Sequence, residues 1–373
     1  MHLASTYTGQ ALIGRDTVAF TTKKISRKNH QQVLATIQEP PVSKKDLRKP
    51  RDENVDAANG FFVDHTCIDC DTCRWIAPEF YKRKNMQSAV LHQPQTEEER
   101  MEAFRALLSC PTYSIHGPAD KKQEQRMAEE SFPSLIPGTD NCYHCGFHDE
   151  LSFGCASYLI KRPEGNILVD VPRYVPKLVN RIKELGGAKY IFLTHRDDVA
   201  AHYKWASALG AERIMHTMET NEKQRTNEVE HKLEGEGPWS LPDGSDDCEI
   251  IYTPGHTEAH CVLFYRPQQV LFSGDHLAAN AVGEWVAKYA PDDGFLGISR
   301  SFNWWRVDKQ VESCTKLAAY DWVTLLPGHG RPGKVKDAAE RELQLELIRQ
   351  RETERGLGEL PSDHSAQSAP QDF

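Results

Sequence analysis

The stretch Cys67-Ile-Asp-Cys70-Asp-Thr-Cys73 decides the fold of the amino-terminal part of this chain. Its three cysteines are separated by two residues each, and a fourth, Cys110, stands directly before a proline. A two-residue gap lets one loop wrap a face of a cubane cluster, and a distant Cys-Pro closes the opposite corner. We therefore predict that Cys67, Cys70, Cys73 and Cys110 bind one 4Fe–4S cluster. A zinc site with four cysteine ligands is the alternative, although such sites usually pair two separate Cys-x-x-Cys units.

The sequence on either side of these cysteines predicts a small α+β domain over residues 57–118. Residues 60–64 are expected to form a strand that leads into the cysteines. Thr96-Glu-Glu-Glu99 is a capping box, and it predicts a helix that ends at Cys110. The cysteine run followed by Cys110-Pro111 resembles the single-cluster ferredoxins of bacterial type. The resemblance implies a ferredoxin-like fold for this domain.

The length and charge of the chain limit its class. It has 373 residues, enough for two domains and their tails. No apolar run is as long as a membrane span, so we expect none. The net charge is −9, but residues 1–51 contain ten Lys/Arg and three acidic residues, so they carry +7 and the remainder carries −16. An acidic body argues against nucleic acid as a partner.

The two ends and the middle of the chain differ in composition from the domains. Residues 1–56 are basic and rich in Ser and Thr without an apolar core, which predicts a disordered transit peptide and linker. We expect import into the plastid stroma, with the mitochondrial matrix as the alternative. Ten cysteines, most of them scattered, fit such a reducing compartment. Residues 119–140 are expected to be an interdomain linker, and residues 356–373 a disordered tail.

Short apolar strands alternate with helical segments over residues 141–355, which predicts a layered α/β domain. Four polar segments in this region each follow an apolar strand, so we expect their side chains to meet at one sheet edge. These segments are Thr194-His195-Arg-Asp197-Asp198, Thr253-Pro-Gly-His256, Ser273-Gly-Asp275 and Pro327-Gly-His329. Imidazole and carboxylate groups suit zinc, iron or manganese.

The order and the glycine context of the four segments resemble the metallo-β-lactamase-fold superfamily, including its glyoxalase II-like hydrolases. The resemblance implies an αββα fold and hydrolysis of a small-molecule ester, thioester or lactone by a metal-bound hydroxide. It also implies that His256 binds a first metal, that Asp275 bridges two metals and that His329 binds the second. His195 and Asp197 are carried over as ligands from the first segment.

The first segment departs from the His-x-His-x-Asp-His pattern that is usual in that superfamily, because Asp197 replaces its second histidine. Asp198 and His202 are four residues apart. They would share one face if a helix has begun there, which makes both candidates for catalysis and His202 a candidate metal ligand. Sites with two metals, with one metal and with none therefore stay open, and so does the choice between zinc and iron.

Three functions are compatible with this combination of sites. The family resemblance favours a hydrolase in which the cluster is a sensor or a structural element. The ferredoxin resemblance favours a redox enzyme in which electrons pass from the cluster to a non-haem iron, with a ferredoxin-linked redox partner. The irregular first segment favours a non-catalytic electron-transfer or assembly factor. The substrate is not indicated by any motif.

Overall fold

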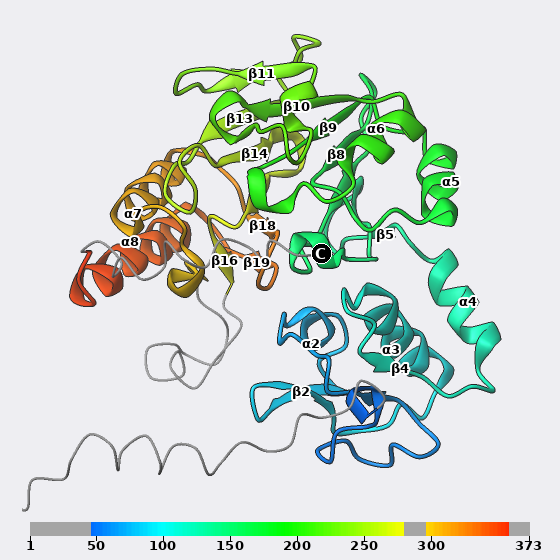
Figure 1. The fold of residues 1–373 in the computed structure, drawn as a ribbon. Coiled ribbons are helices and arrows are strands. Elements are labelled where there is room, and N and C mark those ends of the chain that lie inside the picture. Colours follow the sequence, from blue (N-terminus) through cyan, green and yellow to red (C-terminus); the bar gives the residue numbers. More distant parts are fainter. Residues whose placement is uncertain (1–45, 280–295, 358–373) are drawn as a thin grey trace, which may run out of the picture. The chain divides into compact units, whose positions relative to one another are not determined.

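A computed structural model describes residues 46–279 and 296–357 of the chain. Residues 1–45, which make up most of the predicted transit peptide, and residues 358–373 of the predicted tail lie outside the described part. None of the described helices has the length and apolarity needed to cross a membrane. The described residues form a cysteine domain, which contains the predicted cluster site, and a sandwich domain built on two sheets (Figure 1).

The cysteine domain contains the predicted strand before the cysteines and the predicted helix before Cys110. Its elements in chain order are β1 (Phe62–Val63), α2 (Thr72–Ile76), β2 (Tyr81–Lys84), β3 (Gln87–Val90), α3 (Glu97–Ser109) and β4 (Ile115–His116). Strands β1 and β4 pair antiparallel, and β2 and β3 form a hairpin. The capping box at Thr96 and Glu99 begins α3 as predicted. Phe61, Tyr81 and Phe104 fill the core of this domain.

The cysteine loop turns sharply at the two aspartates that separate its cysteines. Asp69 has φ 61° and Asp71 has φ 67°, in the left-handed region that aspartate tolerates better than most residues. Arg74 fixes both of them, because its guanidinium lies 2.7 Å from an Asp69 carboxylate oxygen and also contacts Asp71. The sequence between the cysteines therefore directs the loop to bring its thiols together.

Two segments that were expected to be linkers contain ordered structure. In residues 119–140 the structure has α4 (Lys122–Glu130), which packs on α3, and β5 (Ser134–Leu135), which pairs with β6. The charged composition of α4 suggested a linker, but its Glu124 contacts Arg100 of α3 and its Ala128 is buried. Ahead of the cysteine domain, the buried Arg51 donates hydrogen bonds to backbone carbonyls of the β2–β3 hairpin.

The sandwich domain contains two mixed sheets. The first sheet consists, in spatial order, of β11 (His231–Leu233), β10 (Glu212–His216), β9 (Tyr190–Phe192), β8 (Ile167–Val169), β7 (Tyr158–Ile160), β6 (Cys142–His144) and β5. The second consists of β12 (Trp239–Ser240), β13 (Cys248–Tyr252), β14 (Cys261–Tyr265), β15 (Val270–Gly274), β18 (Thr324–Pro327) and β19 (Gly333–Lys334). The strands predicted from the apolar runs are all present in these sheets.

Two helices cover each outer face of the sandwich, so the layers follow the predicted αββα order (Figure 1). Helices α5 (Pro176–Glu184) and α6 (His202–Leu209) pack on the first sheet, and α7 (Val307–Lys316) and α8 (Ala338–Glu354) on the second. The sequence of strand β14 is uniformly apolar because both faces of the strand are buried. Its Leu263 faces the core between the sheets, whereas Phe264 faces the helices.

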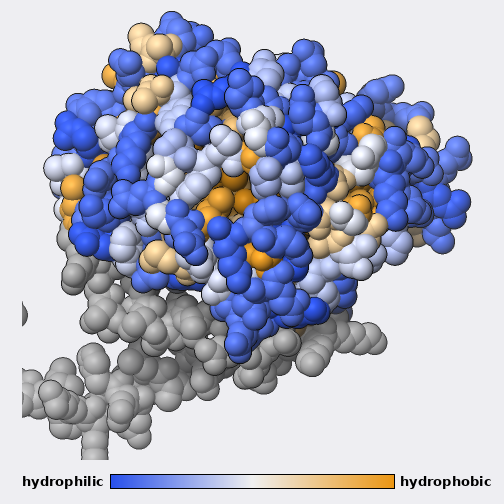
Figure 2. Space-filling view, turned by 90° about the horizontal axis from the view of Figure 1, so that it is seen from above, coloured by the Kyte–Doolittle hydropathy of each residue, from blue (hydrophilic) through white to orange (hydrophobic). Residues whose placement is uncertain are grey.

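The surface of the described residues is mainly polar on the face drawn in Figure 2. Hydrophobic side chains there form small separate patches, some of them inside a hollow. Patches of this size are normal on soluble proteins and do not identify a partner by themselves. The features that indicate a function are therefore the polar groups at the strand ends.

Candidate metal centres

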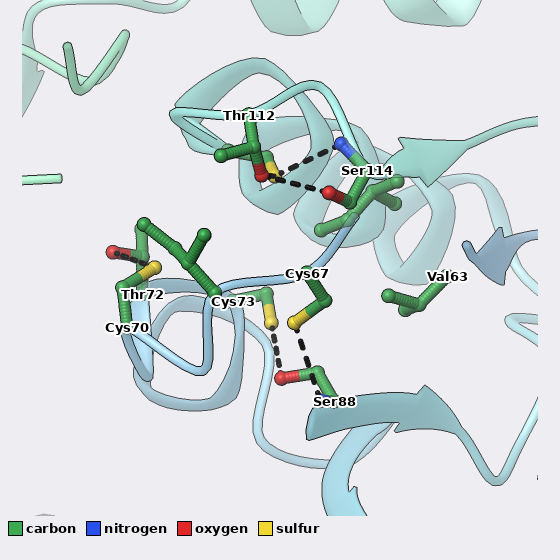
Figure 3. Close-up of a pocket in the computed structure, with 11 residues that line it drawn as sticks. Val63, Cys67, Cys70, Thr72, Cys73, Ser88, Thr112 and Ser114 are labelled. Atoms are coloured by element: carbon green, nitrogen blue, oxygen red, sulfur yellow. Dashed lines mark hydrogen bonds between the residues drawn. The ribbon is translucent and has the colours of Figure 1, made fainter. Parts of the chain in front are cut away.

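The four predicted cysteines line one pocket in the cysteine domain (Figure 3). Cys67, Cys70 and Cys73 come from the loop before and at the start of α2, and Cys110 follows the end of α3. Backbone N–H groups point at two of the sulfurs, from Ser88 to Cys67 Sγ at 3.4 Å and from Ser114 to Cys110 Sγ at 3.3 Å.

The chemistry of this pocket fits an iron–sulfur cluster. Burial, together with the neighbouring Cys110 thiol, raises the pKa of Cys70 to about 12. A thiol in this setting stays protonated unless a metal ion replaces the proton and binds the sulfur. Four convergent sulfurs with N–H donors around them are the ligand set that a 4Fe–4S cluster requires.

In the sandwich domain, the predicted histidines and aspartates gather at one edge of the two sheets. His195, Asp197 and Asp198 follow β9 of the first sheet, while His256, Asp275 and His329 follow strands β13, β15 and β18 of the second. Strands β13, β15 and β18 run in the same direction, so their carboxyl ends reach the same edge. The fold brings six of the predicted residues together across both sheets.

Four of these residues surround a first position. Asp197 Oδ2 lies 3.7 Å from His195 Nε2 and 3.6 Å from His256 Nε2. Asp275 Oδ2 lies 3.8 Å and 3.6 Å from the same two nitrogens. Ligands about 2.0–2.2 Å from a tetrahedral metal would be about 3.3–3.6 Å from one another. His195, His256 and Asp275 are therefore spaced as ligands of one metal, with one atom of each within 4.8 Å of the other two, and Asp197 lies beside both histidines.

Three of the four atoms that face this first position have no hydrogen-bond partner among the described residues. The Nε2 atoms of His195 and His256 and the Oδ2 atom of Asp197 are buried and make no hydrogen bond within the described part of the chain. Leaving buried polar atoms unsatisfied costs about 1–3 kcal/mol each. A divalent cation would satisfy all of them at once, so the residues present fit a bound metal.

Asp170 and Thr194 hold His195 in the orientation that aims its Nε2 at this position. Thr194 donates to the Asp170 carboxylate from its backbone N–H at 2.9 Å and through its hydroxyl at 3.1 Å. The Thr194 hydroxyl oxygen is 3.0 Å from His195 Nδ1, so it can accept the proton of that nitrogen. Burial raises the pKa of Asp170 to about 7. Asp170 was not predicted from the sequence, although it also follows an apolar strand.

Asp198, His329 and the other oxygen of Asp275 surround a second position. His329 Nδ1 lies 2.7 Å from Asp275 Oδ1 and 3.6 Å from Asp198 Oδ2. Both Asp198 carboxylate oxygens are buried and have no hydrogen-bond partner among the described residues. A Cβ placed on Gly328 would lie 3.0 Å from Asp275 Oδ1 and 3.4 Å from Asp198 Oδ2. The absence of a side chain at Gly328 keeps this space open.

The two positions differ in protonation. At the second position, burial opposes a charge on His329, yet the carboxylates of Asp275 and Asp198 raise its pKa to about 10. Burial likewise opposes a charge on Asp275, but His329 and His256 lower its pKa. At the first position, burial and the neighbouring His256 lower the pKa of His195. Without metal, the His329 ring is therefore charged at neutral pH, whereas the His195 ring is neutral.

Two further loops support the ligand-bearing segments. His260 Nε2 lies 3.2 Å from the backbone nitrogen of Asp275 and can accept its hydrogen bond, so this histidine supports the Asp275 segment. Asn303 donates to the carbonyl oxygen of Gly255 at 2.8 Å and to Gln310 of α7 at 2.7 Å. These contacts attach the His256 loop to the helix layer.

His202 does not join the other predicted residues, which corrects its assignment as a ligand and as a catalytic group. Its Nε2 lies 3.0 Å from the carbonyl oxygen of Gln224, and its Nδ1 lies 3.3 Å from Arg213. The predicted pairing with Asp198 required a helix that had already begun. Helix α6 instead starts at His202, and Ala200 between them has φ 33°, so the two side chains do not share a helix face.

Comparisons with known proteins give two family matches. Residues 63–117 match the 4Fe-4S single cluster domain of Ferredoxin I, and residues 151–329 match the metallo-beta-lactamase superfamily. The two resemblances stated from the sequence are therefore confirmed, each over its own part of the chain.

Individual relatives cover parts of the chain. A probable metallo-hydrolase, YqjP of Bacillus subtilis (strain 168), is 28% identical over 120 residues, which are 32% of this chain. The chain spans about a third (35%) of that relative's length. The DIM-1 metallo-beta-lactamase structure has a TM-score of 0.42 and 18% identity, and covers 56% of this chain and 94% of its own. A metallo-beta-lactamase from Pontibacter korlensis has a TM-score of 0.40, 12% identity, and coverages of 57% and 97%.

Proposed function

We propose that this chain, which joins a metallo-β-lactamase-superfamily domain to a single-cluster 4Fe–4S domain, is a hydrolase of small esters, thioesters or lactones. The observation that carries the proposal is the first position, where His195, His256 and Asp275 offer ligand atoms within 4.8 Å of one another and Asp197 lies beside both histidines. Three of the atoms that face this position have no partner among the described residues. His195, Asp197, His256 and Asp275 would hold the first divalent metal there. Asp198, His329 and the bridging Asp275 would hold a second.

Divalent metals bound at these positions would act as Lewis acids and lower the pKa of a water molecule into the neutral range. The protein supplies their orientation and charge. Asp170 and Thr194 keep the His195 ring in one tautomer, and such supporting contacts commonly change metal affinity by about 10–100-fold. Three carboxylates, from Asp197, Asp198 and Asp275, would offset most of the charge of two divalent cations.

An aromatic pair beside the metal loop supports an acyl-type substrate. The backbone N–H of Trp304 donates to the carbonyl oxygen of His256 at 2.9 Å, so Trp304 lies against that loop. Trp304 is 40% exposed, and the ring of the exposed Phe302 is 6.4 Å away. Exposed aromatic rings next to polar reacting groups suit a substrate that has an apolar part.

The first test removes one ligand of the first position. In His256→Ala we expect loss of the first metal and a fall of at least about 100-fold in kcat/KM, because both the Lewis acid and its water are lost. Zinc and iron would be counted by elemental analysis of anaerobically purified protein. Hydrolysis would be measured with a chromogenic ester, an acyl thioester and a lactone.

Two variants serve as controls for this test. His231→Ala changes a histidine on the edge strand β11 and should keep both metal and activity. Cys70→Ser should lose the cluster iron but keep the zinc. Unchanged zinc content in His256→Ala would rule out a metal at the first position. Fully zinc-loaded protein that hydrolyses none of the three substrates would refute the proposed hydrolase activity.

A second candidate function is a ferredoxin-linked redox enzyme that receives electrons through the cluster. One observation favours it: the cysteine loop lies against the sandwich domain, since a Cβ placed on Gly154 would be 3.5 Å from Cys70 Sγ. In this case the second-domain metal would be iron. About five or six iron atoms per chain with no zinc, and reoxidation of the reduced cluster by a substrate, would favour this function over hydrolysis.

A further inference from the structure

A buried cysteine outside the four predicted segments lies at the second position. Cys155 stands between η2 (Glu150–Ser152) and β7, and its side chain is 1% exposed. One ligand atom from each of Cys155, Asp198 and His329 lies within 4.8 Å of the other two. A Cβ placed on Gly328 would lie 2.8 Å from Cys155 Sγ, closer than it would lie to either carboxylate. The thiol therefore borders the same open space as Asp198 and Asp275.

The backbone around Cys155 fixes the thiol in this place. Asp149 accepts a hydrogen bond from the N–H of Leu151 at 2.9 Å and so caps the short helix η2. Phe153 and Gly154 follow in left-handed conformations, with φ 49° and φ 89°, and reverse the chain. The next residue, Ala156, donates its N–H to the carbonyl oxygen of Gly328 at 2.8 Å. The Cys155 segment is thus tied directly to the loop that carries His329.

We propose that Cys155 is a thiolate ligand of the second metal, which would then be bound by Cys155, Asp198 and His329, with Asp275 as the bridge. On binding, the S–H bond is replaced by a metal–sulfur bond and the proton leaves to solvent. A sulfur ligand favours zinc or ferrous iron over magnesium or manganese at this position. The inference rests on the metal site of the proposed function but not on its reaction.

The competing role for Cys155 is that of an ordinary buried thiol. Its Sγ lies 3.3 Å from the carbonyl oxygen of Ala156, a contact that a thiol can make as a weak donor. Cys261 on β14 is a matched example, because it is fully buried and its Sγ lies 3.4 Å from the carbonyl oxygen of Ala259. Cys155 differs from Cys261 in facing the imidazole and carboxylate groups of the second position.

The test is X-ray absorption at the zinc edge on the full chain that contains its cluster and has been loaded with zinc. The edge reports zinc alone, so the iron and sulfur of the cluster do not contribute. With both positions filled, we expect a zinc–sulfur distance of about 2.3 Å at about one sulfur per two zinc ions, beside nitrogen and oxygen at about 2.0–2.2 Å. Cys155→Ser should lose the sulfur contribution, and its affinity for the second zinc should fall more than about tenfold.

The control Cys261→Ser should keep the zinc–sulfur contribution unchanged. Wild-type protein with two zinc ions and only nitrogen and oxygen neighbours would overturn the proposal, even if that protein hydrolyses its substrate. A zinc–sulfur contribution that persists in Cys155→Ser would also overturn it, since the zinc would then occupy other thiols such as those of the cysteine domain. A wild-type spectrum without sulfur neighbours overturns the proposal by itself, so that outcome does not depend on whether the variant folds.

Discussion

His195 lies at the first position and His329 at the second, and their imidazole rings carry different charges in the metal-free protein. Burial and His256 lower the pKa of His195, so its ring is neutral and ready to bind a cation. His329 is opposed by burial but paired with Asp275 and Asp198, which raise its pKa to about 10. Its charge stabilises the metal-free fold fully below about pH 6.5, the unfolded value, and this contribution is lost as the pH rises through about 10.

This difference predicts that the two positions respond differently to pH. A metal at the second position must displace the proton of His329, so its affinity should fall at least about tenfold for each pH unit between about pH 8 and about pH 6. Affinity at the first position should change much less over that range. Calorimetric zinc titrations in buffers of different ionisation enthalpy would count the protons released. Equal pH dependence at both positions would contradict the assignment.

At the scale of residues, the sequence predicted the candidate ligands that follow strands and missed Cys155, whose place depends on loop geometry. His195, His256, Asp275 and His329 could be found because a polar residue after an apolar strand is visible in the pattern. His202 was misplaced, because spacing alone does not show that the helix starts only at His202 itself. Cys155 carries no motif, and only the tertiary fold brings it to Asp198.

Among the elements, the turn from β13 to the His256 loop is the tightest contact with the helix layer. Gly255 has φ 149°, and a Cβ placed on it would lie 2.1 Å from the Cα of Gln310 in α7. Real Cβ atoms do not approach a backbone atom so closely. Position 255 therefore requires glycine for two reasons, because α7 packs directly on it and because its φ is positive.

We expect Gly255→Ala to destabilise the protein by roughly 3 kcal/mol or more, because either α7 or the His256 loop must move. Gly187→Ala is a matched control. Gly187 also has a positive φ, 73°, but a Cβ on it would meet nothing within 4 Å, so only the backbone cost of about 1–2 kcal/mol applies. Chemical denaturation of the two variants gives the comparison. Equal losses of stability would show that the contact with α7 is unimportant.

The central strands of the sandwich domain were predictable because burial on both faces leaves a continuous apolar run, as in β14. Helix α4 was not, since its charged sequence resembles a solvated linker and only Ala128 is buried. Its position depends on contacts with α3, such as that between Arg100 and Glu124, which are far apart in the sequence. A local pattern cannot predict an element whose stability comes from such a partner.

At the scale of the whole molecule, the described structure places the cysteine pocket next to the candidate metal site of the sandwich domain. Gly154 lies between them. A Cβ placed on it would lie 3.5 Å from Cys70 Sγ, and the next residue, Cys155, borders the second position. Thr72 and His148 also face each other across this contact, with 3.2 Å between the hydroxyl and Nδ1. The distance between the sites is thus set by a few side chains in direct contact.

This proximity predicts a magnetic interaction between the sites. In dithionite-reduced protein, paramagnetic Co²⁺ in the second domain should accelerate the relaxation of the cluster's EPR signal, compared with diamagnetic Zn²⁺. More microwave power would then be needed to saturate the signal at the same temperature. Asp198→Ala, which weakens the second position, should reduce the effect. Identical saturation curves for the cobalt and zinc forms would contradict the close approach.

The ion pair between Arg331 and Asp71 has a consequence for how the protein matures. Arg331 Nε lies 2.7 Å from Asp71 Oδ2, and Arg331 stands two residues after His329. Asp71 lies inside the cysteine loop, between Cys70 and Cys73, and its backbone is in the left-handed conformation. Arg74 holds Asp71 inside that loop by a contact that does not involve the thiols. We therefore expect the loop to dock on Arg331 before iron and sulfur are inserted, so that the cluster is assembled in a loop that is already in place.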